Sequence, residues 1–383
     1  MKTRTTFILF LTAILTLAAG SAFGSYSGGS GTAGDPYKIA TKPDLLALAA
    51  TTGDYSKCFI LTADINMGGL IFTTAIIAAD TNSSSGFQGT AFSGTFDGND
   101  HKITNFTING VNSCYLSLFG YITSSGLIKN LGLENCAVSG DSNSQYVSGL
   151  VGFSVYGSIS NCHSTGSVSG HSNVGGLVGY NDDGSVSNCY STGAVSGSSG
   201  STYVGGLVGY NTGGISDCYS TGAVSASGSY YVGGLVGYNF GSGSISNCYS
   251  TSTVSGSYYV GGLVGFYFDG SISNCYSTGA VSGSSNVGGL VGYNFGSGGT
   301  VSSFWDINTS GQTASAGGTG KTTAQMKTLS TFISAGWDFT SVWVLPLGQY
   351  PMLFLRQAGD LNYDGRVDFV DFALFADHWL SSE

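Results

Sequence analysis

The amino-acid sequence predicts an all-β protein in which about seven to nine coils stack into a parallel β-helix, or β-solenoid, with capped ends. Three observations support this prediction. Glycine supplies 63 of 383 residues and charged residues only 8%, which disfavours helices because glycine weakens helix interiors and the usual exposed helix formers are scarce. Apolar residues reach 42%, enough to exclude a disordered chain. The third observation is an internal repeat whose units are 27 to 30 residues long.

The first 24 residues are typical of a secretory signal peptide. Lys2 and Arg4 form a positively charged start, an apolar run covers residues 7–19, and residues 22–24 (Ala-Phe-Gly) have the small-x-small pattern of a cleavage site. The apolar run is too short to span a bilayer. We therefore expect an exported protein, secreted or held at the cell surface, without a membrane-spanning segment.

The charge distribution limits the classes of partner. The formal net charge is −10 at pH 7, and no Lys or Arg occurs between Asn130 and Gly320. A nucleic-acid groove needs basic side chains that displace counterions from the phosphates. This stretch cannot supply them, so we expect no nucleic-acid partner.

Residues 25–116 are expected to form an N-terminal cap and the early coils. Residues 35–53 contain Asp-Pro-Tyr followed by an apolar run that starts at Pro43, which predicts an edge strand and a short helix. Residues 59–61 and 92–108 have the β-branched and aromatic composition of less regular strands. Residues 94–98, followed by Ile103, resemble the opening coils of right-handed parallel β-helix proteins.

Residues 117–300 carry the repeat. The tetrad Gly-Leu-Val-Gly begins at Gly149, Gly176, Gly206, Gly234, Gly262 and Gly289. A second block, read as Ile-Ser-Asn-Cys-Tyr-Ser-Thr-Gly-Ala-Val-Ser-Gly, recurs between the tetrads. One unit is too short to bury a core alone, so we expect the units to stack and to place Leu177, Leu207 and Leu235 in one file. A β-propeller is the alternative fold, but its blades usually need about 40 residues.

The tetrads and their companion blocks resemble the GLUG repeats of bacterial surface and secreted proteins over about residues 117–300. The resemblance implies a β-solenoid in an exported protein; some members are adhesins and others are attached to peptidases. It carries no catalytic residue over to this chain. Insertions before the tetrads, at residues 196–203 and 225–231, are expected to collect on one edge of the solenoid.

Six cysteines hold the same place in successive repeats, namely Cys136, Cys162, Cys189, Cys218, Cys248 and Cys275. A column of buried thiols, a set of disulfides and a metal ladder are all open interpretations. We favour buried thiols, because parallel in-register neighbours strain the disulfide dihedral and because the chain has no Cys-x-x-Cys pair. Cys58 and Cys114 lie outside the column and are left as a candidate disulfide pair.

Polar and aromatic residues form further columns. Two columns of asparagine are interpreted as structural, one with Asn161, Asn188, Asn247, Asn274 and Asp217, the other with Asn181, Asn211, Asn239 and Asn294. An aromatic column contains Tyr190, Tyr219, Tyr249 and Tyr276, with His163 in its first slot. Tyr203, Tyr231 and Tyr259 precede the tetrads. Exposed tyrosines suit stacking on sugar rings, and the alternative is that the rings only stabilise the solenoid.

Residues 301–357 are expected to form a C-terminal cap. Trp305 stands where the cysteine block should continue, residues 322–332 have helical spacing, and Trp337 and Trp343 follow. Bulky aromatic side chains at the end of an open sheet would block pairing with another chain.

Residues 358–383 contain the strongest chemical motif, a predicted Ca²⁺-binding loop. Its oxygen ligands are assigned to the side chains of Asp360, Asn362, Asp364, Asp368 and Asp371 and to the carbonyl of Arg366. Gly365 permits the sharp turn of such a loop. Aspartate at the last position and the apolar run that follows resemble a type I dockerin repeat. Dockerins normally carry two such repeats and this chain has one, which puts docking to a cohesin-like partner in doubt.

Catalytic candidates are few. Hydrolysis of a glycosidic bond needs two carboxylates about 5–10 Å apart, and the coils offer Asp182, Asp183, Asp217 and Asp269, with Asp97, Asp100 and His101 as a second cluster. We therefore predict a non-catalytic binding, adhesion or scaffolding protein whose partner is an extracellular polysaccharide or protein. The alternative is a carbohydrate-active enzyme, a β-helix hydrolase or lyase, or a component of a polysaccharide-degrading assembly.

Overall fold

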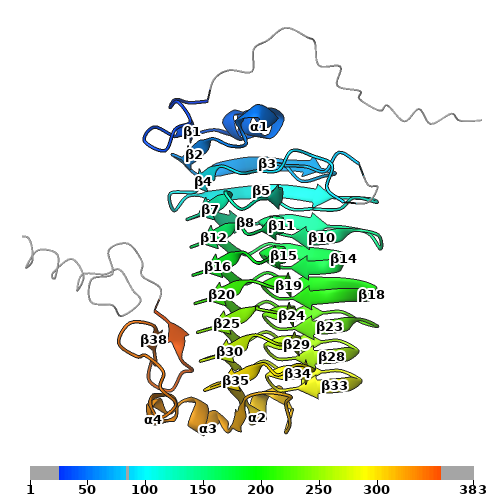
Figure 1. Ribbon diagram of the computed structural model, residues 1–383, viewed down its shortest axis with the longest axis vertical. Coiled ribbons are helices and arrows are strands. Elements are labelled where there is room, and N and C mark those ends of the chain that lie inside the picture. The colour runs from blue at the N-terminus through cyan, green and yellow to red at the C-terminus, as the bar shows by residue number, and fades with distance from the viewer. Residues whose placement is uncertain (1–25, 83–85, 355–383) are drawn as a thin grey trace, which may run out of the picture.

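The computed structural model describes residues 26–82 and 86–354. It confirms a parallel β-solenoid, of about eight turns, with few helices. Successive coils stack in chain order along the long axis of the molecule (Figure 1). Strands from consecutive repeats pair in parallel throughout the stack, which excludes the propeller. The predicted signal peptide and the predicted calcium loop lie outside the described residues.

Three parallel sheets run along the described part of the stack. The ten-stranded sheet contains β1 (Tyr37–Ile39), β2 (Cys58–Leu61), β4 (Thr95–Asp97), β7 (Leu127–Lys129), β12 (Ser158–Ser160), β16 (Ser185–Ser187), β20 (Gly214–Ser216), β25 (Ser244–Ser246), β30 (Ser271–Ser273) and β35 (Gly299–Val301). The seven-stranded sheet contains β6 (Phe119–Ile122), β11 (Val151–Val155), β15 (Val178–Asp182), β19 (Val208–Asn211), β24 (Val236–Phe240), β29 (Val264–Phe268) and β34 (Val291–Asn294).

The largest sheet forms the remaining side of the coils. Its strands are β3 (Ile65–Phe72), β5 (Lys102–Asn109), β8 (Gly132–Glu134), β9 (Ala137–Ser139), β10 (Gln145–Ser148), β13 (His163–Ser164), β14 (Ser167–Gly175), β17 (Tyr190–Ser191), β18 (Val195–Gly205), β21 (Tyr219–Ser220), β22 (Val224–Ser225), β23 (Tyr230–Gly233), β26 (Tyr249–Ser250), β27 (Val254–Ser255), β28 (Tyr258–Gly261), β31 (Tyr276–Ser277), β32 (Val281–Ser282), β33 (Ser285–Gly288), β36 (Phe304–Asp306) and β37 (Thr319–Lys321). The insertion at residues 196–203 lies inside β18, the longest of these strands.

In the core, equivalent apolar side chains of successive coils stack in rows along the axis of the solenoid. Val178 pairs with Val208, and Val208 pairs with Val236, in consecutive strands of the seven-stranded sheet. The backbone N–H of Leu177 donates to the carbonyl of Leu207 (3.0 Å), and that of Leu207 donates to the carbonyl of the leucine in the next coil (2.9 Å). All these side chains are fully buried. The predicted leucine file is therefore confirmed.

The glycine that precedes five of the six tetrads marks a close approach of two backbone segments. A Cβ atom on Gly233 would lie 1.9 Å from the carbonyl oxygen of Val236, and one on Gly261 would lie 1.9 Å from that of Val264. A Cβ at such a distance forces the backbone to shift, so the Gly-Gly pair lets the chain turn tightly into the buried Leu-Val segment. The first of these coils has Ser148 in this slot, where its hydroxyl donates to the carbonyl of Val151 (2.6 Å).

The cysteine column is buried and made of free thiols. The Cys189 thiol donates to the carbonyl of Ser187 (3.1 Å) and the backbone N–H of Cys189 donates to the Cys218 sulfur (3.4 Å). Cys58 and Cys114 are half-buried and also free, so the suggested pairing between them is wrong in this structure. Ser303 takes the place of a cysteine in the last coil, where its hydroxyl accepts from the backbone N–H of Cys275 (3.1 Å).

Both ends of the described solenoid are capped. At the N-terminal end, α1 (Lys42–Ala50) starts with a reciprocal capping box between Thr41 and Asp44, and a short 3₁₀ helix (Thr52–Asp54) follows. At the other end lie α2 (Ile307–Ser310), α3 (Thr323–Met326), α4 (Leu329–Ile333) and the antiparallel pair β38 (Trp343–Val344) and β39 (Met352–Leu353).

The C-terminal cap turns back along the flank of the solenoid, so that β38 lies beside the last coils (Figure 1). Its core contains Met326, Phe332, Trp337 and Trp343. The helix expected over residues 322–332 is interrupted: α3 ends at Met326 and α4 begins at Leu329. Thr328 between them has an extended backbone (φ −114°, ψ 118°), which breaks the helix.

Candidate functional site

The predicted aromatic column forms as expected. His163, Tyr190, Tyr219, Tyr249 and Tyr276 follow one another on adjacent coils, with ring centroids 4.7 to 5.1 Å apart and ring planes within 7° of parallel. This spacing follows from the strand separation of about 4.8 Å in a parallel sheet. Because each ring faces its neighbours in the stack, the interior rings have little free face for a sugar.

The C-terminal cap covers the far end of this column, which corrects part of the predicted sugar-stacking site. Tyr276 is 1% and Tyr249 is 7% exposed, and the rings of Trp337 and Trp343 pack against them. The Tyr276 hydroxyl donates to the carbonyl of Pro351. Neither tyrosine can therefore reach a ligand, whereas Tyr190 and Tyr219 stay half-buried.

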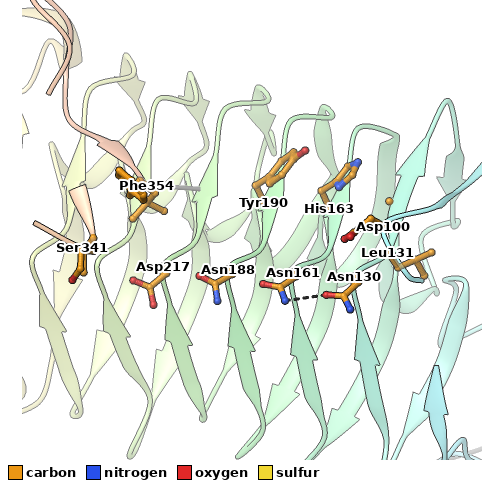
Figure 2. A pocket seen from close by; sticks show the side chains of 13 residues that line it. Asp100, Asn130, Leu131, Asn161, His163, Asn188, Tyr190, Asp217, Ser341 and Phe354 are labelled. Atoms are coloured by element: carbon orange, nitrogen blue, oxygen red, sulfur yellow. Dashed lines mark hydrogen bonds between the residues drawn. The ribbon is translucent and has the colours of Figure 1, made fainter. Parts of the chain in front are cut away.

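A groove of about 1060 Å³ opens beside the uncovered part of the column. Figure 2 shows Asn130, Asn161, Asn188 and Asp217 in one row along successive coils, with His163 and Tyr190 beside them. Ser341, Val342, Leu353 and Phe354 of the cap supply the opposite wall. The groove thus joins polar corner residues, aromatic rings and an apolar wall.

The polar row consists of corner residues with positive φ, between 51° and 53° at Asn130, Asn161, Asn188 and Asp217. Asparagine and aspartate tolerate this left-handed conformation better than other side chains. The Asn161 amide donates to the Asn130 carbonyl oxygen (3.0 Å), and the Asn247 amide donates to the Asp217 carboxylate (3.0 Å). The structural interpretation of this column is confirmed at these positions.

Charged groups gather at the N-terminal end of the column. The Nε2 atom of His163 lies 3.9 Å from the Glu134 carboxylate, which also accepts from Lys102 Nζ at 2.8 Å. Burial lowers the pKa of the His163 imidazole, and Glu134 opposes this effect only in part. His163 is therefore favoured in its neutral form within the fold.

A second aromatic surface lies on another side of the coils, and only its corner tyrosines Tyr203, Tyr231 and Tyr259 were noted in the sequence. The residue directly after each tetrad is aromatic and forms a column on the seven-stranded sheet: Tyr121, Phe153, Tyr180, Tyr210, Tyr238, Phe266 and Tyr293. A neighbouring corner column contains Tyr115, Tyr146, Tyr203, Tyr231 and Tyr259. We call the two columns together the aromatic ladder. The recurrence of Phe or Tyr at the position after the tetrad was the signal that could have revealed it.

The ladder has a herringbone geometry. Tyr231 is nearly parallel to Tyr203 and Tyr259 (10° and 8°), whereas it stands at 84° to Tyr238 and 90° to Phe266. Except for Tyr115, its rings are half-buried. Burial raises the pKa of Tyr238 to about 12, so its phenol keeps its proton at physiological pH. Exposed Phe240 and Phe295, with Phe268 between them, widen the surface near the C-terminal end.

The corner tyrosines of the ladder have an unusual backbone. Tyr146, Tyr203, Tyr231 and Tyr259 have φ values of 52° to 60°. The left-handed region costs an ordinary residue about 1–2 kcal/mol. Two coils place asparagine in the same slot, Asn173 and Asn286, with the same sign of φ. The coil therefore folds without tyrosine at this corner, and the tyrosines are retained at an energetic cost.

The predicted catalytic candidates are dispersed. Asp182 lies in β15 of the seven-stranded sheet, whereas Asp217 lies in the corner row of the groove, so the structure does not bring the two together. Asp269 accepts hydrogen bonds from Ser297 (2.8 and 3.0 Å).

Two members of the second candidate cluster, Asp97 and His101, form ion pairs or hydrogen bonds within the fold. Asp97 pairs with Lys129 (3.0 Å), and His101 contacts the Asp64 carboxylate (3.1 Å). The carboxylate of Asp100 lines one end of the groove.

Metal ligands were predicted only in the tail. Asp360, Asn362, Asp364, Arg366, Asp368 and Asp371 lie outside the described residues, so the structure does not test them. Within residues 26–82 and 86–354, no three His, Cys, Asp or Glu side chains gather closely enough to hold a metal ion. None of the helices in the same ranges has the length and apolarity that a membrane crossing needs.

Fold and site together define a Gly- and Ser-rich parallel β-solenoid built from short repeats, with aromatic columns on its flank. Five of its segments match the family described as "The GLUG motif": residues 143–169, 170–196, 200–225, 228–255 and 256–282. The GLUG interpretation of these repeats is thereby confirmed. The dockerin resemblance of the tail stays a prediction.

The chain resembles curated proteins and solved structures, among them the following three. Halomucin from Haloquadratum walsbyi is 32% identical over 163 residues, which are 40% of this chain and 2% of halomucin. A chain described as a "putative immunoglobulin A1 protease" from Bacteroides ovatus has a TM-score of 0.56 and 24% identity, covering 86% of this chain and 95% of its own. A second, described as "IgA1 Protease", has a TM-score of 0.54 and 19% identity, covering 84% of this chain and 26% of its own. At these identities the likeness shows the solenoid fold alone.

Proposed function

We propose that this protein is an exported binding protein that holds an extracellular polysaccharide along its aromatic ladder. The observation that carries the proposal is the tyrosine at the left-handed corner in Tyr146, Tyr203, Tyr231 and Tyr259. Each of these residues costs about 1–2 kcal/mol that asparagine largely avoids. Strained residues of this kind are concentrated at binding sites, where the side chain serves a purpose other than stability.

The chemistry of the ladder suits a neutral, hydroxyl-rich polymer. Ring edges provide apolar contact and each phenol can donate or accept one hydrogen bond. Tyr230 and Tyr258 are both 41% exposed and stack 4.8 Å apart beside the corner column. The same contacts therefore repeat from coil to coil, and a polymer can use several of them at once.

Export rests on the sequence and on the comparisons. The start of the chain has the pattern of a signal peptide. The likeness to halomucin and to the IgA1 protease structures favours a protein that is secreted or held at the cell surface. We include this location in the proposal.

Binding of the polymer is tested by cosedimentation of the full chain with insoluble neutral polysaccharides such as cellulose, chitin, xylan and mannan. The matched variant carries Tyr203→Asn, Tyr231→Asn and Tyr259→Asn, because asparagine occupies this slot in two other coils. We expect the variant to keep its melting temperature or raise it, and to lose most of its binding. A wild-type protein that sediments with none of these polymers, or a variant that binds as well as wild type, would refute the proposal.

Calcium in the C-terminal loop is a separate part of the proposal, which the sequence alone supports. Carboxylate oxygens at this spacing wrap around Ca²⁺. Calorimetric titration of the full chain with CaCl₂ should show one site, and the double variant Asp360→Ala with Asp364→Ala should remove it. The same substitution at Asp338, outside the loop, serves as the control. Heat of binding that survives in the double variant would disprove the assignment.

A further inference from the structure

The corner row of the groove contains a break in its hydrogen-bond ladder. In this row the amide N–H of one residue donates to the oxygen of the residue one coil earlier, as Asn161 does to Asn130 and Asn274 does to Asn247. Asp217 has no N–H to donate. The amide oxygen of Asn188, one coil before it, therefore receives no N–H from the row, and the Asn188 amide N–H does not donate to Asn161 either. The Asn188 side chain has no hydrogen-bond partner among the described residues.

The break coincides with the groove. Asn188 and Asp217 both line it, whereas Asn247 and Asn274, which continue the ladder, do not. The carboxylate of Asp217 accepts from the Asn247 amide through one oxygen (3.0 Å), and its other oxygen has no hydrogen-bond partner among residues 26–82 and 86–354. A carboxylate oxygen and a complete amide group are thus available to a ligand at adjacent positions.

The residues that line the rest of the groove add aromatic and apolar surface to this polar pair. Tyr190 follows Asn188 by two residues along the chain, and Val342, Leu353 and Phe354 of the cap also line the groove. Pockets that bind small ligands combine apolar surface with a few convergent polar groups in this way. No Lys or Arg lines the groove, and Asp100 and Asp217 make it acidic. An anionic ligand is therefore disfavoured.

We propose that this groove binds a short stretch of a neutral sugar chain, with Asp217 and Asn188 recognising the hydroxyl groups of one sugar residue. The carboxylate accepts from sugar hydroxyls, while the Asn188 amide both donates and accepts. Val342 and the ring edge of Tyr190, whose two faces are covered by His163 and Tyr219, offer apolar contact to the C–H groups of the sugar. The inference rests on the proposed function for its ligand class, and it assigns a second binding site apart from the aromatic ladder.

The test is calorimetric titration of the full chain with neutral hexasaccharides: cello-, xylo-, manno- and malto-hexaose. Asp217→Asn restores the missing donor and so should raise the melting temperature. It also removes the charged acceptor, so we expect the affinity for the bound hexasaccharide to fall about tenfold or more. The control Asn274→Asp, in the same row but outside the groove, should leave the affinity unchanged. A hexasaccharide of galacturonic acid should not bind.

The outcomes separate this inference from the proposed function. If Asp217→Asn binds the hexasaccharides as wild type does, or if wild type binds none of them, the groove is not a sugar site. Polysaccharide cosedimentation that depends on the ladder tyrosines would in that case still support the proposed function. If the wild-type protein binds neither the insoluble polysaccharides nor the hexasaccharides, both the proposed function and the groove inference are overturned.

Discussion

At the scale of single residues, polar side chains do as much as apolar ones to define each coil. Asn181, Asn211 and Asn239 are fully buried. The Asn181 amide donates to the Asn211 side-chain oxygen (2.8 Å), and the Asn211 amide donates to the Asn239 side-chain oxygen (2.7 Å). The Asn211 amide also donates to the carbonyl of Gly213 (2.9 Å). Buried polar groups are costly when unpaired, so this column requires that every coil keep its register.

Asn211→Leu tests this buried amide column. The substitution leaves the Asn181 amide and the Asn239 carbonyl oxygen short of a partner, and each such group costs about 1–3 kcal/mol. We expect a loss of about 2–5 kcal/mol in unfolding free energy, measured by denaturant titration. Asn161→Gly, at an exposed corner with positive φ, should cost about 1 kcal/mol or less. Equal losses in the two variants would contradict the account.

His163 makes the stability depend on pH. Burial lowers the pKa of its imidazole below the value in the unfolded chain, about 6.5. The unfolded state therefore binds more protons as pH falls below that value, and stability is lost toward acid. His163→Tyr, which matches the other members of the column, should flatten this loss. Melting temperatures between pH 8 and pH 5 measure it, and parallel curves for the two proteins would exclude the effect.

Residue roles were predictable where they repeat and unpredictable where they depend on a distant segment. The stacking of Tyr190 on Tyr219 followed from the period, and the structure shows it. The burial of Tyr249 and Tyr276 depends on Trp337 and Trp343, which come from a segment without the repeat. The break at Asp217 was visible in the sequence, but its position in a groove was not.

At the scale of elements, the corners rather than the strands restrict the sequence most. Many strands are only two to four residues long, such as β17 and β21. Short strands accept several side chains, because outward positions meet few neighbours. The glycines at the corners meet backbone atoms directly.

Gly233→Ala tests the corner geometry. The new Cβ would stand 1.9 Å from the carbonyl oxygen of Val236, so the backbone must shift. We expect a loss of about 3 kcal/mol, as for overpacked cores. Gly214→Ser is the matched control, because a Cβ there meets its nearest atom at 3.7 Å and the same slot holds Ser185 and Ser244 in adjacent coils. Its unfolding free energy should change by about 0.5 kcal/mol or less. A stable Gly233→Ala protein would show that the corner can relax.

Element prediction failed where the repeat ends. Residues 322–332 have helical spacing, yet Thr328 adopts an extended backbone between α3 and α4. The break allows Met326 and Phe332 both to enter the core of the cap. Packing against the solenoid therefore overrides local helix preference in this segment.

At the scale of the whole molecule, the repeat period determines the architecture. Stacking adds one coil per repeat and buries each coil between two others, so the stability is roughly a sum of coil and interface contributions. The sequence alone was sufficient to predict the solenoid, the leucine file and the buried thiols for this reason. The path of the C-terminal cap was not predictable, because its contacts join segments without shared periodicity.

Removal of whole and half repeats tests this stacking most directly. Deleting residues 206–233 joins Gly205 to Gly234 and removes one full period, whereas deleting residues 206–219 removes half of one. We expect the full-period variant to unfold cooperatively at a lower temperature and to be shorter by about 4.8 Å in solution X-ray scattering. The half-period variant should not fold, since its remaining coils lose register. Two variants that unfold alike would contradict the stacked solenoid.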